Sequence, residues 1–568
     1  MEKHLLNVNI GVLGHVDSGK TSLSRALSTT ASTNAFDKNP QSKERGITLD
    51  LGFSSCVHDL PKHLAKEPFD ALQFTLVDCP GHASLIRTII GGAQIIDQMI
   101  LVIDITKGIQ TQTAECLVIG EITTKKLVVV LNKADLLAPD TREKHIVKTK
   151  KKLAKVFAKT KFPMPEMVVV SAKPGGPEAD APAEGLDTLL ETLLGKVELP
   201  KRDVDGPLLF AVDHCFSIKG QGTVLTGTVL RGTVKVGAEI ELPAQGMIRK
   251  VKSMQMFRRP VEAAVMGDRL GMCVTALDAK TIERGVVCAP GSLPAMTAAV
   301  ACVEKIRFFK SAVKTKQKFH LSVGHATVMC AVTFFGSDEG GSELDLERDF
   351  HYIDELDLPP NLEAGKEPAA AAAAGDQESA SYRNQFALLE FDSPVNCSPN
   401  ALVIGSRLDA DVHTPHCRLA FSGTLQLHTT EAAYKPFLQQ FKVYKPKVRT
   451  GTVDRMMDDH TVIGRTLFSK DTALDKFLGL KVRLSTGETG VIDSGFGKSG
   501  KFKVYIADGL GDEARAALKG KGKKGKGKAA AAVDGGDDDV DAPSSENVSI
   551  ILEFKRYIFD PDKALRQA

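Results

Sequence analysis

A glycine-rich segment near the start of the chain has the residue types and spacing needed to bind phosphates. Residues 14–21 read G-H-V-D-S-G-K-T and fit the pattern G-x-x-x-x-G-K-[ST]. The glycines let backbone N–H groups turn toward phosphate oxygens, the lysine can reach the β- and γ-phosphates, and the threonine hydroxyl can bind Mg²⁺. We therefore predict a nucleoside triphosphate site that contains Asp17, Ser18, Gly19, Lys20, Thr21 and Ser22.

The residues around this loop supply the elements that it needs. The apolar run 8–13 predicts a buried strand, and residues 22–26 can begin a helix. A strand, a loop and a helix in this order form the context in which the pattern binds phosphates. Strand-like runs then alternate with helical stretches such as 84–96 and 144–160. This alternation predicts a parallel sheet with crossover helices.

Two later motifs indicate which base the site binds. Residues 132–135 (N-K-A-D) and 171–173 (S-A-K) each follow a strand-like apolar run. The carboxylate of Asp135 can accept the ring N–H and the exocyclic amine of guanine, whereas adenine would leave it buried and unpaired. The motifs therefore predict a GTPase domain that binds GTP and GDP. The residues expected around the base are Asn132, Lys133, Asp135, Ser171, Ala172 and Lys173.

Two more segments could sense the γ-phosphate. Asp78 could hold Mg²⁺ through water, the N–H of Gly81 could meet the γ-phosphate, and His82 could orient the attacking water as the catalytic residue. Upstream, Thr48 could give Mg²⁺ a second hydroxyl while GTP is bound. Loss of the γ-phosphate would release both segments. A buried structural histidine is the plain alternative for His82, but its place in D-C-P-G-H favours water positioning.

Composition limits the class of protein. The 568 residues carry a net charge of only +3, so any nucleic-acid contact must come from local patches. None of the ten cysteines forms a C-x-x-C pair, so we expect a reducing compartment. The chain begins without an apolar signal core, and no apolar run approaches the ~20 residues of a membrane helix. No membrane partner is expected.

The pattern changes after about residue 200, where short β-rich runs are punctuated by glycine at a spacing typical of barrels. The predicted fold class is therefore multidomain, with an α/β P-loop GTPase domain followed by three β-barrel-type domains. The predicted bounds are 1–200 for the GTPase domain, 206–291 for the second domain, 299–442 for the third with a flexible insertion at 337–381, and 443–568 for the fourth with a charged insertion at 519–546.

These motifs together resemble the translational GTPases. Residues 220–228 (G-Q-G-T-V-L-T-G-T) look like the second-domain barrel of elongation factor Tu, which lacks a fourth domain. A narrower resemblance is to the eukaryotic and archaeal selenocysteine-specific elongation factors. It covers nearly the whole chain except the two insertions. It is carried by 45–53 (R-G-I-T-L-D-L-G-F), 213–220 (D-H-C-F-S-I-K-G), 462–465 (V-I-G-R) and 484–487 (L-S-T-G).

The resemblance implies a selenocysteine pocket at Asp213, His214 and Arg269. A selenol is largely ionised near neutral pH, whereas a serine hydroxyl is not and a thiol with a pKa of about 8.5 mostly is not. A pocket with cations and donors would therefore prefer the selenolate. Spacing alone favours the plainer alternative, in which Asp213 and Arg269 form a surface salt bridge and His214 packs in a barrel wall.

Basic residues in the fourth domain are candidates for RNA contacts, with Tyr444 as one stacking surface. A solvated basic face is the plain alternative, but the resemblance implies that this domain contacts the variable arm of selenocysteine tRNA. The RNA-binding candidates are Lys442, Lys445, Lys447, Arg449 and Arg455.

The resemblance implies a cytoplasmic, monomeric elongation factor, with the nucleus as a second compartment. It would bind GTP, Mg²⁺ and selenocysteinyl-tRNA and deliver the tRNA to the ribosome to decode UGA, with GTP hydrolysis on correct decoding. The selenocysteine-insertion RNA element would be reached through a separate RNA-binding protein. Three alternatives are delivery of ordinary aminoacyl- or initiator tRNA, regulation of a sulfate-activating enzyme, and an RNA scaffold with a lapsed GTPase. The pocket argues against ordinary cargo, the basic fourth domain argues against the role with a sulfate-activating enzyme, and the intact catalytic set argues against a lapsed GTPase.

Overall fold

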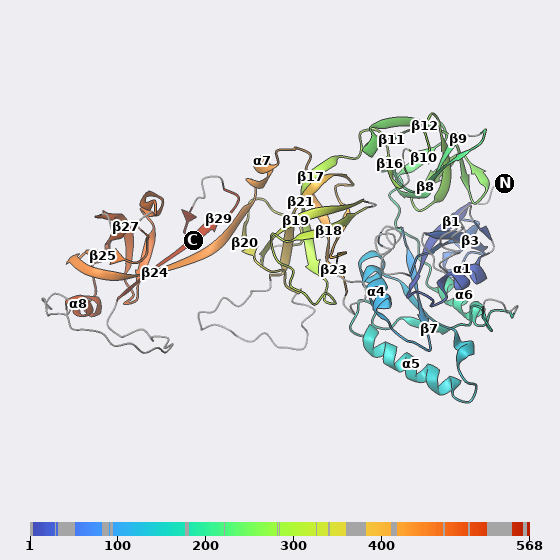
Figure 1. The fold of residues 1–568 in the computed structure, drawn as a ribbon, viewed down its shortest axis with the longest axis horizontal. Helices are drawn as coiled ribbons and strands as arrows, with labels where there is room; N and C mark the ends of the chain where they lie inside the picture. Colours follow the sequence, from blue (N-terminus) through green and yellow to red (C-terminus); the bar gives the residue numbers. More distant parts are fainter. Residues whose placement is uncertain are drawn as a thin grey trace. The chain divides into compact units, whose positions relative to one another are not determined.

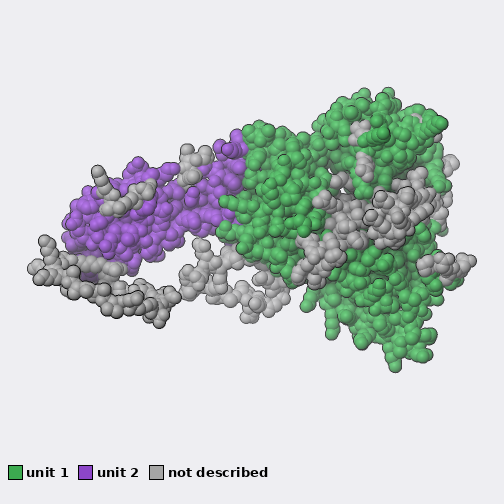
Figure 2. All heavy atoms as spheres, viewed as in Figure 1, with its two compact units in different colours: residues 1–334, 341–343, 354–434 green, residues 335–340, 344–353, 435–568 purple. Residues whose placement is uncertain are grey.

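The chain forms two compact units, coloured separately in Figure 2. The first contains residues 1–334, 341–343 and 354–434, and the second contains residues 335–340, 344–353 and 435–568. The structure is a computed structural model, and it describes residues 4–28, 30–31, 51–81, 90, 95–176, 181–220, 222–280, 282, 284–324, 326–338, 341–358, 382–409, 417–469, 472–497, 500–519, 548–560 and 565–567.

The N-terminal part of the first unit is built on a seven-stranded sheet with the order β2-β3-β4-β1-β5-β6-β7 (Figure 1). Strands β4, β1, β5, β6 and β7 run parallel, and β3 runs antiparallel to β4. In β1 every residue after Leu5 is buried, as expected where helices cover both faces of a parallel sheet. The strands are β1 Leu5–Gly14, β2 Thr30–Ala31, β3 Gly52–His58, β4 Ala71–Asp78, β5 Gln98–Asp104, β6 Leu127–Asn132 and β7 Glu166–Val169.

Helices cover both faces of this sheet. Leu23 of α1 and Leu189 of α6 belong to the core on one face, and Leu117 of α4 and Phe157 of α5 belong to the core on the other. The predicted helix 144–160 is confirmed as α5, whereas most of 84–96 lies outside the described residues. The helices are α1 Lys20–Leu27, α4 Thr111–Thr123, α5 Arg142–Phe157 and α6 Leu186–Gly195, with 3₁₀ turns at Lys62–Leu64 and Ala134–Leu136.

The second domain is a six-stranded barrel. Its strands follow the order β11-β16-β8-β9-β15-β12, and pairing of β11 with β12 closes the ring. Alternate residues such as Phe210, Leu225 and Met272 fill the interior, as expected for a small barrel. The strands are β8 Leu209–Ile218, β9 Gly222–Arg231, β10 Thr233–Lys235, β11 Glu239–Leu242, β12 Met247–Met256, β13 Arg259–Val261, β14 Ala263–Val265, β15 Arg269–Val274 and β16 Gly285–Cys288, with a 3₁₀ turn at Pro243–Gln245.

The third domain closes in the same way, in the order β18-β22-β23-β17-β21-β19 with β18 paired to β19. Phe421 is packed edge-on against both Phe319 and Phe334 in its core. The strands are β17 Ala295–Lys305, β18 Lys318–Val323, β19 Ala326–Ser337, β21 Asn384–Asn396, β22 Leu402–Ser406 and β23 Leu419–Thr429.

The second unit contains the fourth domain. Its strands follow the order β24-β25-β28-β27-β26-β29, and β24 also pairs with β29. The strands are β20 Asp349–Ile353, β24 Lys442–Asp458, β25 Thr461–Arg465, β26 Lys481–Leu484, β27 Thr489–Phe496, β28 Lys501–Tyr505, β29 Ser549–Tyr557 and β30 Leu565–Arg566, with helices α7 Lys435–Leu438 and α8 Asp512–Lys519 and a 3₁₀ turn at Leu474–Phe477.

The fold class predicted from the sequence is confirmed, but one boundary needs correction. Part of the segment 337–381, expected to be a flexible insertion, forms strand β20, which runs parallel to β24 with Phe350 opposite Val443. Both of these apolar side chains are buried. The remainder of that segment from 359, and residues 520–546 of the charged insertion, lie outside the described residues. Within the described ranges, no helix has both the length and the apolar character of a membrane span.

Candidate functional site

The phosphate loop connects β1 to α1, and its backbone adopts the conformations that the glycine pattern requires. Gly19, the N-cap of α1, has a φ of 91°, and no side chain caps the helix there. The first N–H groups of α1 therefore face the loop, where an anion can accept from them. A Cβ at Gly19 would lie 2.2 Å from Nδ2 of Asn132, so this position also brings the loop against the base-reading motif. Asp17 and Ser22 flank the loop, with Asp17 exposed and Ser22 half-buried.

Lys20, Thr21 and Asp78 lie together at the start of α1. The Lys20 ammonium donates to the carbonyl of His15 at 2.7 Å. Burial lowers the pKa of Lys20, while the nearby carboxylate of Asp78 acts in the opposite direction. The Thr21 hydroxyl donates to Oδ2 of Asp78 at 2.7 Å. A hydroxyl beside a buried carboxylate is the kind of oxygen donor set that Mg²⁺ prefers, so these residues fit the predicted ion.

Gly81 lies directly against the phosphate loop. A Cβ added at this position would lie 2.4 Å from Nζ of Lys20 and 2.8 Å from the backbone nitrogen of Val16. Any side chain here would occupy the space next to the lysine that is predicted to reach the γ-phosphate. Thr48 and His82, the other two residues predicted to act at the γ-phosphate, lie outside the described residues.

The base-reading motifs meet the phosphate loop through one amide. Nδ2 of Asn132 donates to the carbonyl of Ser18 at 2.9 Å, and its Oδ1 accepts from the backbone N–H of Ala172 at 3.0 Å. One buried side chain therefore joins three segments that are far apart in the sequence. The N–H of Asp135 donates to the Ser171 hydroxyl at 3.1 Å, which holds the carboxylate-bearing turn against the third segment.

Two lysines flank this base site. Lys133 has a φ of 64°, and its ammonium lies 3.0 Å from Oδ2 of Asp104. This ion pair fixes the stem of Lys133 beside the strand ends. Lys173 is exposed at the start of the loop after β7. The structure thus brings Asn132, Asp135, Ser171 and Ala172 together, and Lys133 and Lys173 lie next to them in the chain.

The predicted aminoacyl pocket contains a buried ion pair. Nη1 of Arg269 donates to Oδ2 of Asp213, and each of the two residues is only 5% exposed. Asp213 lies at a bulge in β8, where the register with β9 shifts between Val212 and His214. The alternative of a surface salt bridge is therefore wrong, because both side chains are buried. Arg269 alternates with Leu270 of the barrel core, so its side chain lies on the outer face of the barrel, against the GTPase domain. His214 is half-buried beside them.

Phe53 contacts the arginine of the predicted pocket, and the sequence reasoning missed it. Its fully buried ring lies in β3 of the GTPase domain, with Cζ of Arg269 3.0 Å from the ring centroid. A guanidinium over an aromatic face is held by the ring quadrupole. The only signal in the sequence was the aromatic residue that ends R-G-I-T-L-D-L-G-F, and nothing in that string indicates a contact with a residue more than 200 positions away.

Further contacts fix the second barrel to the GTPase domain near this pocket. Asn7 and Asn9 of β1 both donate through Nδ2 to the carbonyl of Gly267, at 2.6 and 2.9 Å. Gly267 lies two residues before Arg269. In the segment that connects the two domains, Arg202 contacts both carboxylate oxygens of Asp97, at 2.8 and 2.6 Å. The strand that leads into the phosphate loop therefore also supports the turn that leads into the pocket.

The predicted RNA-binding residues are not equivalent in the structure. Lys442 lies 3.1 Å from Glu347, Lys445 lies 3.7 Å from the centroid of the Tyr352 ring, and the Arg449 guanidinium lies among the rings of Phe468, Phe477 and Phe554. These three therefore have partners within the domain. Lys447 and Arg455 are exposed, although Cζ of Arg455 lies 5.5 Å from the centroid of the Phe496 ring.

The expectation that Tyr444 offers a stacking face is wrong. Its ring is buried, and its hydroxyl lies 2.7 Å from Nε2 of His351. Lys555 covers the ring, with Nζ 4.4 Å from the centroid. Lys447, together with part of Tyr444, lines a cleft of about 480 Å³ that also contains Lys481 and Arg483.

Comparison with known proteins agrees with this architecture. Family models match residues 6–199 as the elongation factor Tu GTP binding domain and 222–289 as elongation factor Tu domain 2. The fold and the phosphate site thus define a GTPase of the translation elongation factor class. Residues 300–423 match the third domain of eukaryotic selenocysteine-specific elongation factors, and 439–563 match the eEFSec C-terminal RIFT domain.

Relatives narrow the class to one family. The chain is 52% identical over 577 residues to the selenocysteine-specific elongation factor of Mus musculus, with 99% of each chain covered. It is 36% identical over 332 residues to that of Methanocaldococcus jannaschii, covering 57% of this chain and 66% of the other. The crystal structure of translation elongation factor SelB from Methanococcus maripaludis with the GTP analogue GppNHp is similar, with a TM-score of 0.67, 25% identity, and 98% and 100% coverage. The chain belongs to the selenocysteine-specific elongation factors.

Proposed function

We propose that this chain binds GTP and selenocysteinyl-tRNA and delivers the tRNA to the ribosome to decode UGA, with GTP hydrolysis on correct decoding. The observation that carries the proposal is the buried Asp213–Arg269 pair in the barrel next to the GTPase domain. A neutral aminoacyl side chain such as serine brings no charge to pair with a buried guanidinium. A selenolate does, because it brings a full negative charge at neutral pH.

The pair can hold an anion without being dismantled. A guanidinium carries five N–H donors, so Arg269 can keep its bond to Asp213 and still donate to a selenolate. Asp213 and the Phe53 ring fix the plane of the guanidinium from two sides. This preorganisation reduces the entropy lost when the cargo binds. His214 would add a second donor at the same strand bulge.

The nucleotide chemistry depends on positioning. Lys20 would reach the β- and γ-phosphates, and the N–H of Gly81 would contact the γ-phosphate. Thr21 would hold Mg²⁺ directly and Asp78 through a water, with Thr48 as a second hydroxyl. When bound, Mg²⁺ neutralises charge on the phosphate oxygens. His82 would orient the attacking water, so catalysis needs no covalent intermediate with the protein.

The fourth domain would bind the tRNA through its phosphates. Lys447, Lys481 and Arg483 surround one cleft, and Lys555 and Glu553 also line it. Four cations against one carboxylate suit a phosphate backbone more than a base edge, because phosphate contacts position RNA without reading its sequence. Contact with the selenocysteine-insertion RNA element would go through a separate RNA-binding protein. We place the factor in the cytoplasm as a monomer, with the nucleus as a second compartment.

A tRNA-protection assay tests the proposal. The same tRNA carrying selenocysteine, serine or cysteine is exposed to hydrolysis of its ester bond, with the protein and GTP present. Selenocysteinyl-tRNA should be protected at much lower protein concentration than the other two, and GDP should abolish the difference. Equal protection of all three charged forms would favour ordinary aminoacyl-tRNA delivery and would overturn the proposed specificity.

A further inference from the structure

Helix α5 of the GTPase domain carries a concentration of positive charge that the nucleotide and aminoacyl sites do not use. Residues 142–157 contain seven Lys or Arg and one Glu, a local net charge of +6 in a chain whose total is +3. The helix follows β6 and precedes β7 in the chain, and it lies on the outside of the sheet (Figure 1). Because the charge of the chain as a whole is nearly balanced, this helix is a distinct electrostatic feature.

The lysines of α5 lie on one face. At about 100° per residue, five of them fall within an arc of about 100°, opposite the buried Leu153 and Phe157. All five are exposed, and among the described residues none of them forms an ion pair, whereas Arg142 at the start of the helix pairs with Glu184 at 3.1 Å. We call this face the lysine stripe, and it consists of Lys144, Lys148, Lys151, Lys152 and Lys155.

A solvated helix face ordinarily carries both signs of charge, which pair along the helix. The lysine stripe instead places like charges four residues apart, as in Lys144–Lys148, and three residues apart, as in Lys148–Lys151. Such pairs repel and weaken a helix. Binding of a polyanion along the face would remove this repulsion. The lysine stripe is therefore suited to binding a negatively charged partner.

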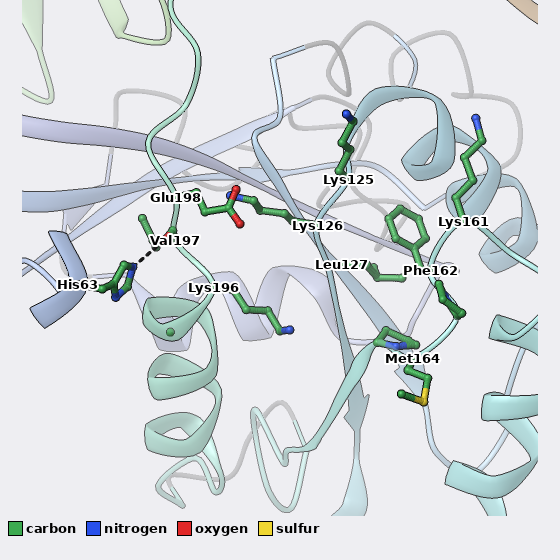
Figure 3. Close-up of a pocket in the computed structure, with 13 residues that line it drawn as sticks. His63, Lys125, Lys126, Leu127, Lys161, Phe162, Met164, Lys196, Val197 and Glu198 are labelled. Atoms are coloured by element: carbon green, nitrogen blue, oxygen red, sulfur yellow. Dashed lines mark hydrogen bonds and ion pairs between the residues drawn. The ribbon is translucent and has the colours of Figure 1, made fainter.

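The charge continues past the end of the helix. Lys161 lies four residues after the end of α5 and lines a pocket of about 530 Å³ with Lys125, Lys126 and Lys196. Figure 3 shows the side chains of Lys125 and Lys161 pointing to the same side of this pocket. Lys126 and Lys196 each have a carboxylate partner, Glu198 at 2.9 Å and Glu166 at 3.5 Å. Lys125 and Lys161 have no such partner among the described residues, so they add to the positive charge of the lysine stripe.

We propose that the lysine stripe binds the phosphate backbone of ribosomal RNA when the factor reaches the ribosome. Lysine is a point-charge donor without the planar fork that reads base edges, and the stripe contains no aromatic side chain for stacking, so the contact would position the factor without reading sequence. The inference rests on the proposed delivery to the ribosome. An acidic protein segment is the competing partner.

The strand order of the sheet argues against the tRNA cargo as the partner of the lysine stripe. The aminoacyl pocket touches the GTPase domain at Phe53 in β3, near one edge of the sheet, whereas α5 joins β6 to β7 at the other edge. Four strand spacings separate β3 from β6, roughly 19 Å at about 4.8 Å each. The stripe is therefore on a part of the domain away from the aminoacyl end.

The test compares two matched double variants in the full chain with GTP bound. Lys148→Gln with Lys151→Gln removes two charges of the stripe while keeping a residue of similar helix propensity. Lys310→Gln with Lys314→Gln removes two exposed lysines from the third domain of the same unit. Nucleotide binding by both variants serves as the check on folding, because none of these lysines lies in the nucleotide site.

The stripe variant should bind purified ribosomes several-fold more weakly than the unmodified protein. The slope of log affinity against log salt concentration should fall by about 1.5, as expected for two lost phosphate contacts. The control variant should retain both values. Affinity for selenocysteinyl-tRNA should be unchanged in both. An equal loss for tRNA, or no loss for ribosomes, would overturn the inference.

A photo-crosslinker at position 148 identifies the partner on ribosomes. Crosslinks to ribosomal RNA are expected, and crosslinks to a ribosomal protein alone would overturn the inference in favour of the acidic segment. Failure of the proposed function is distinguishable from these outcomes, because then the unmodified protein itself would not bind ribosomes with selenocysteinyl-tRNA.

Discussion

The guanidinium of Arg269 lies over the ring of Phe53, with Cζ 3.0 Å from the ring centroid. Arg269 begins β15 of the second barrel, and Phe53 lies in β3 of the GTPase domain, five residues after Thr48. The cation predicted to meet the selenolate therefore touches the strand that follows the segment predicted to sense the γ-phosphate. A change of nucleotide that moved this strand would also move the ring on which the Arg269 guanidinium packs.

Replacement of Asp135 by Asn should change nucleotide choice. The carboxylate offers two acceptor sites to guanine, whereas the amide offers one acceptor and one donor group. Asp135→Asn should therefore weaken GTP binding and favour xanthosine triphosphate, measured by competition for the site. Asp187→Asn, at an exposed position in α6, is the control. Unchanged preference for guanine would remove Asp135 as the base reader.

Replacement of His82 by Ala should separate binding from chemistry. GTP binding should stay nearly intact, and ribosome-stimulated hydrolysis should fall roughly a hundredfold or more, the scale of a lost positioning group. Single-turnover hydrolysis on programmed ribosomes is the measurement, with His428→Ala in the third domain as the control. If the His82 variant hydrolyses GTP at the rate of the unmodified protein, His82 takes no part in the mechanism.

Replacement of Arg269 should reduce the preference for selenocysteinyl-tRNA over seryl-tRNA, because it should weaken the binding of selenocysteinyl-tRNA only. Arg269→Ala should weaken selenocysteinyl-tRNA binding by about 1.5–3 kcal/mol, roughly ten- to a hundredfold, because a charge-assisted contact is lost. Seryl-tRNA has no such contact to lose. The loss of Arg269 also leaves Asp213 buried without its partner, so thermal stability is measured alongside.

Arg269→Lys keeps the charge without the planar fork that serves Asp213, and it should recover part of the preference. His214→Ala should act in the same direction as Arg269→Ala, because a hydrogen-bond donor beside the selenolate is lost. Equal losses for the two charged tRNAs would mean that the pair only supports the barrel.

The cleft of the fourth domain should contribute to tRNA affinity in a salt-dependent way. Lys447→Gln with Arg483→Gln should weaken selenocysteinyl-tRNA binding and lower the salt slope by about 1.5, because two phosphate contacts are lost. Lys435→Gln with Lys503→Gln removes two cations of the same unit outside the cleft. Similar behaviour of the two double variants would show that the cleft is not the contact surface.

Asp268, next to the pocket arginine, should make stability depend on pH. Burial raises its pKa to about 6, although its side chain accepts from the N–H of Val265 at 2.9 Å. The folded state therefore binds more protons than the unfolded state between about pH 4 and pH 6, and stability falls as pH rises through this window. Asp268→Asn should stabilise the protein by about 1–3 kcal/mol at pH 7 and by little at pH 4. Thermal unfolding at both pH values measures this, and equal effects at the two would contradict it.

The nucleotide site could be predicted because each of its motifs is local. The contact between Thr21 and Asp78 follows from the parallel pairing of β1 with β4, because the loop after β1 begins next to the end of β4 and leads into the helix that carries Thr21. Phe53 could not be predicted, because its partner belongs to another domain. The position of the Arg449 guanidinium could not be predicted either. The three rings around it come from separate segments of the fourth domain that only the folded barrel brings together.

Strand β20 has a consequence for engineering this family. The second unit takes residues 344–353 from within the third-domain region as well as everything from 435 onward, and β20 supplies the parallel neighbour of β24 at Phe350 and Val443. A chimera made with a single junction near residue 440 would transplant β24 without that neighbour. The unpaired edge would then be free to recruit strands from other molecules. A transferable module must therefore be encoded in two pieces.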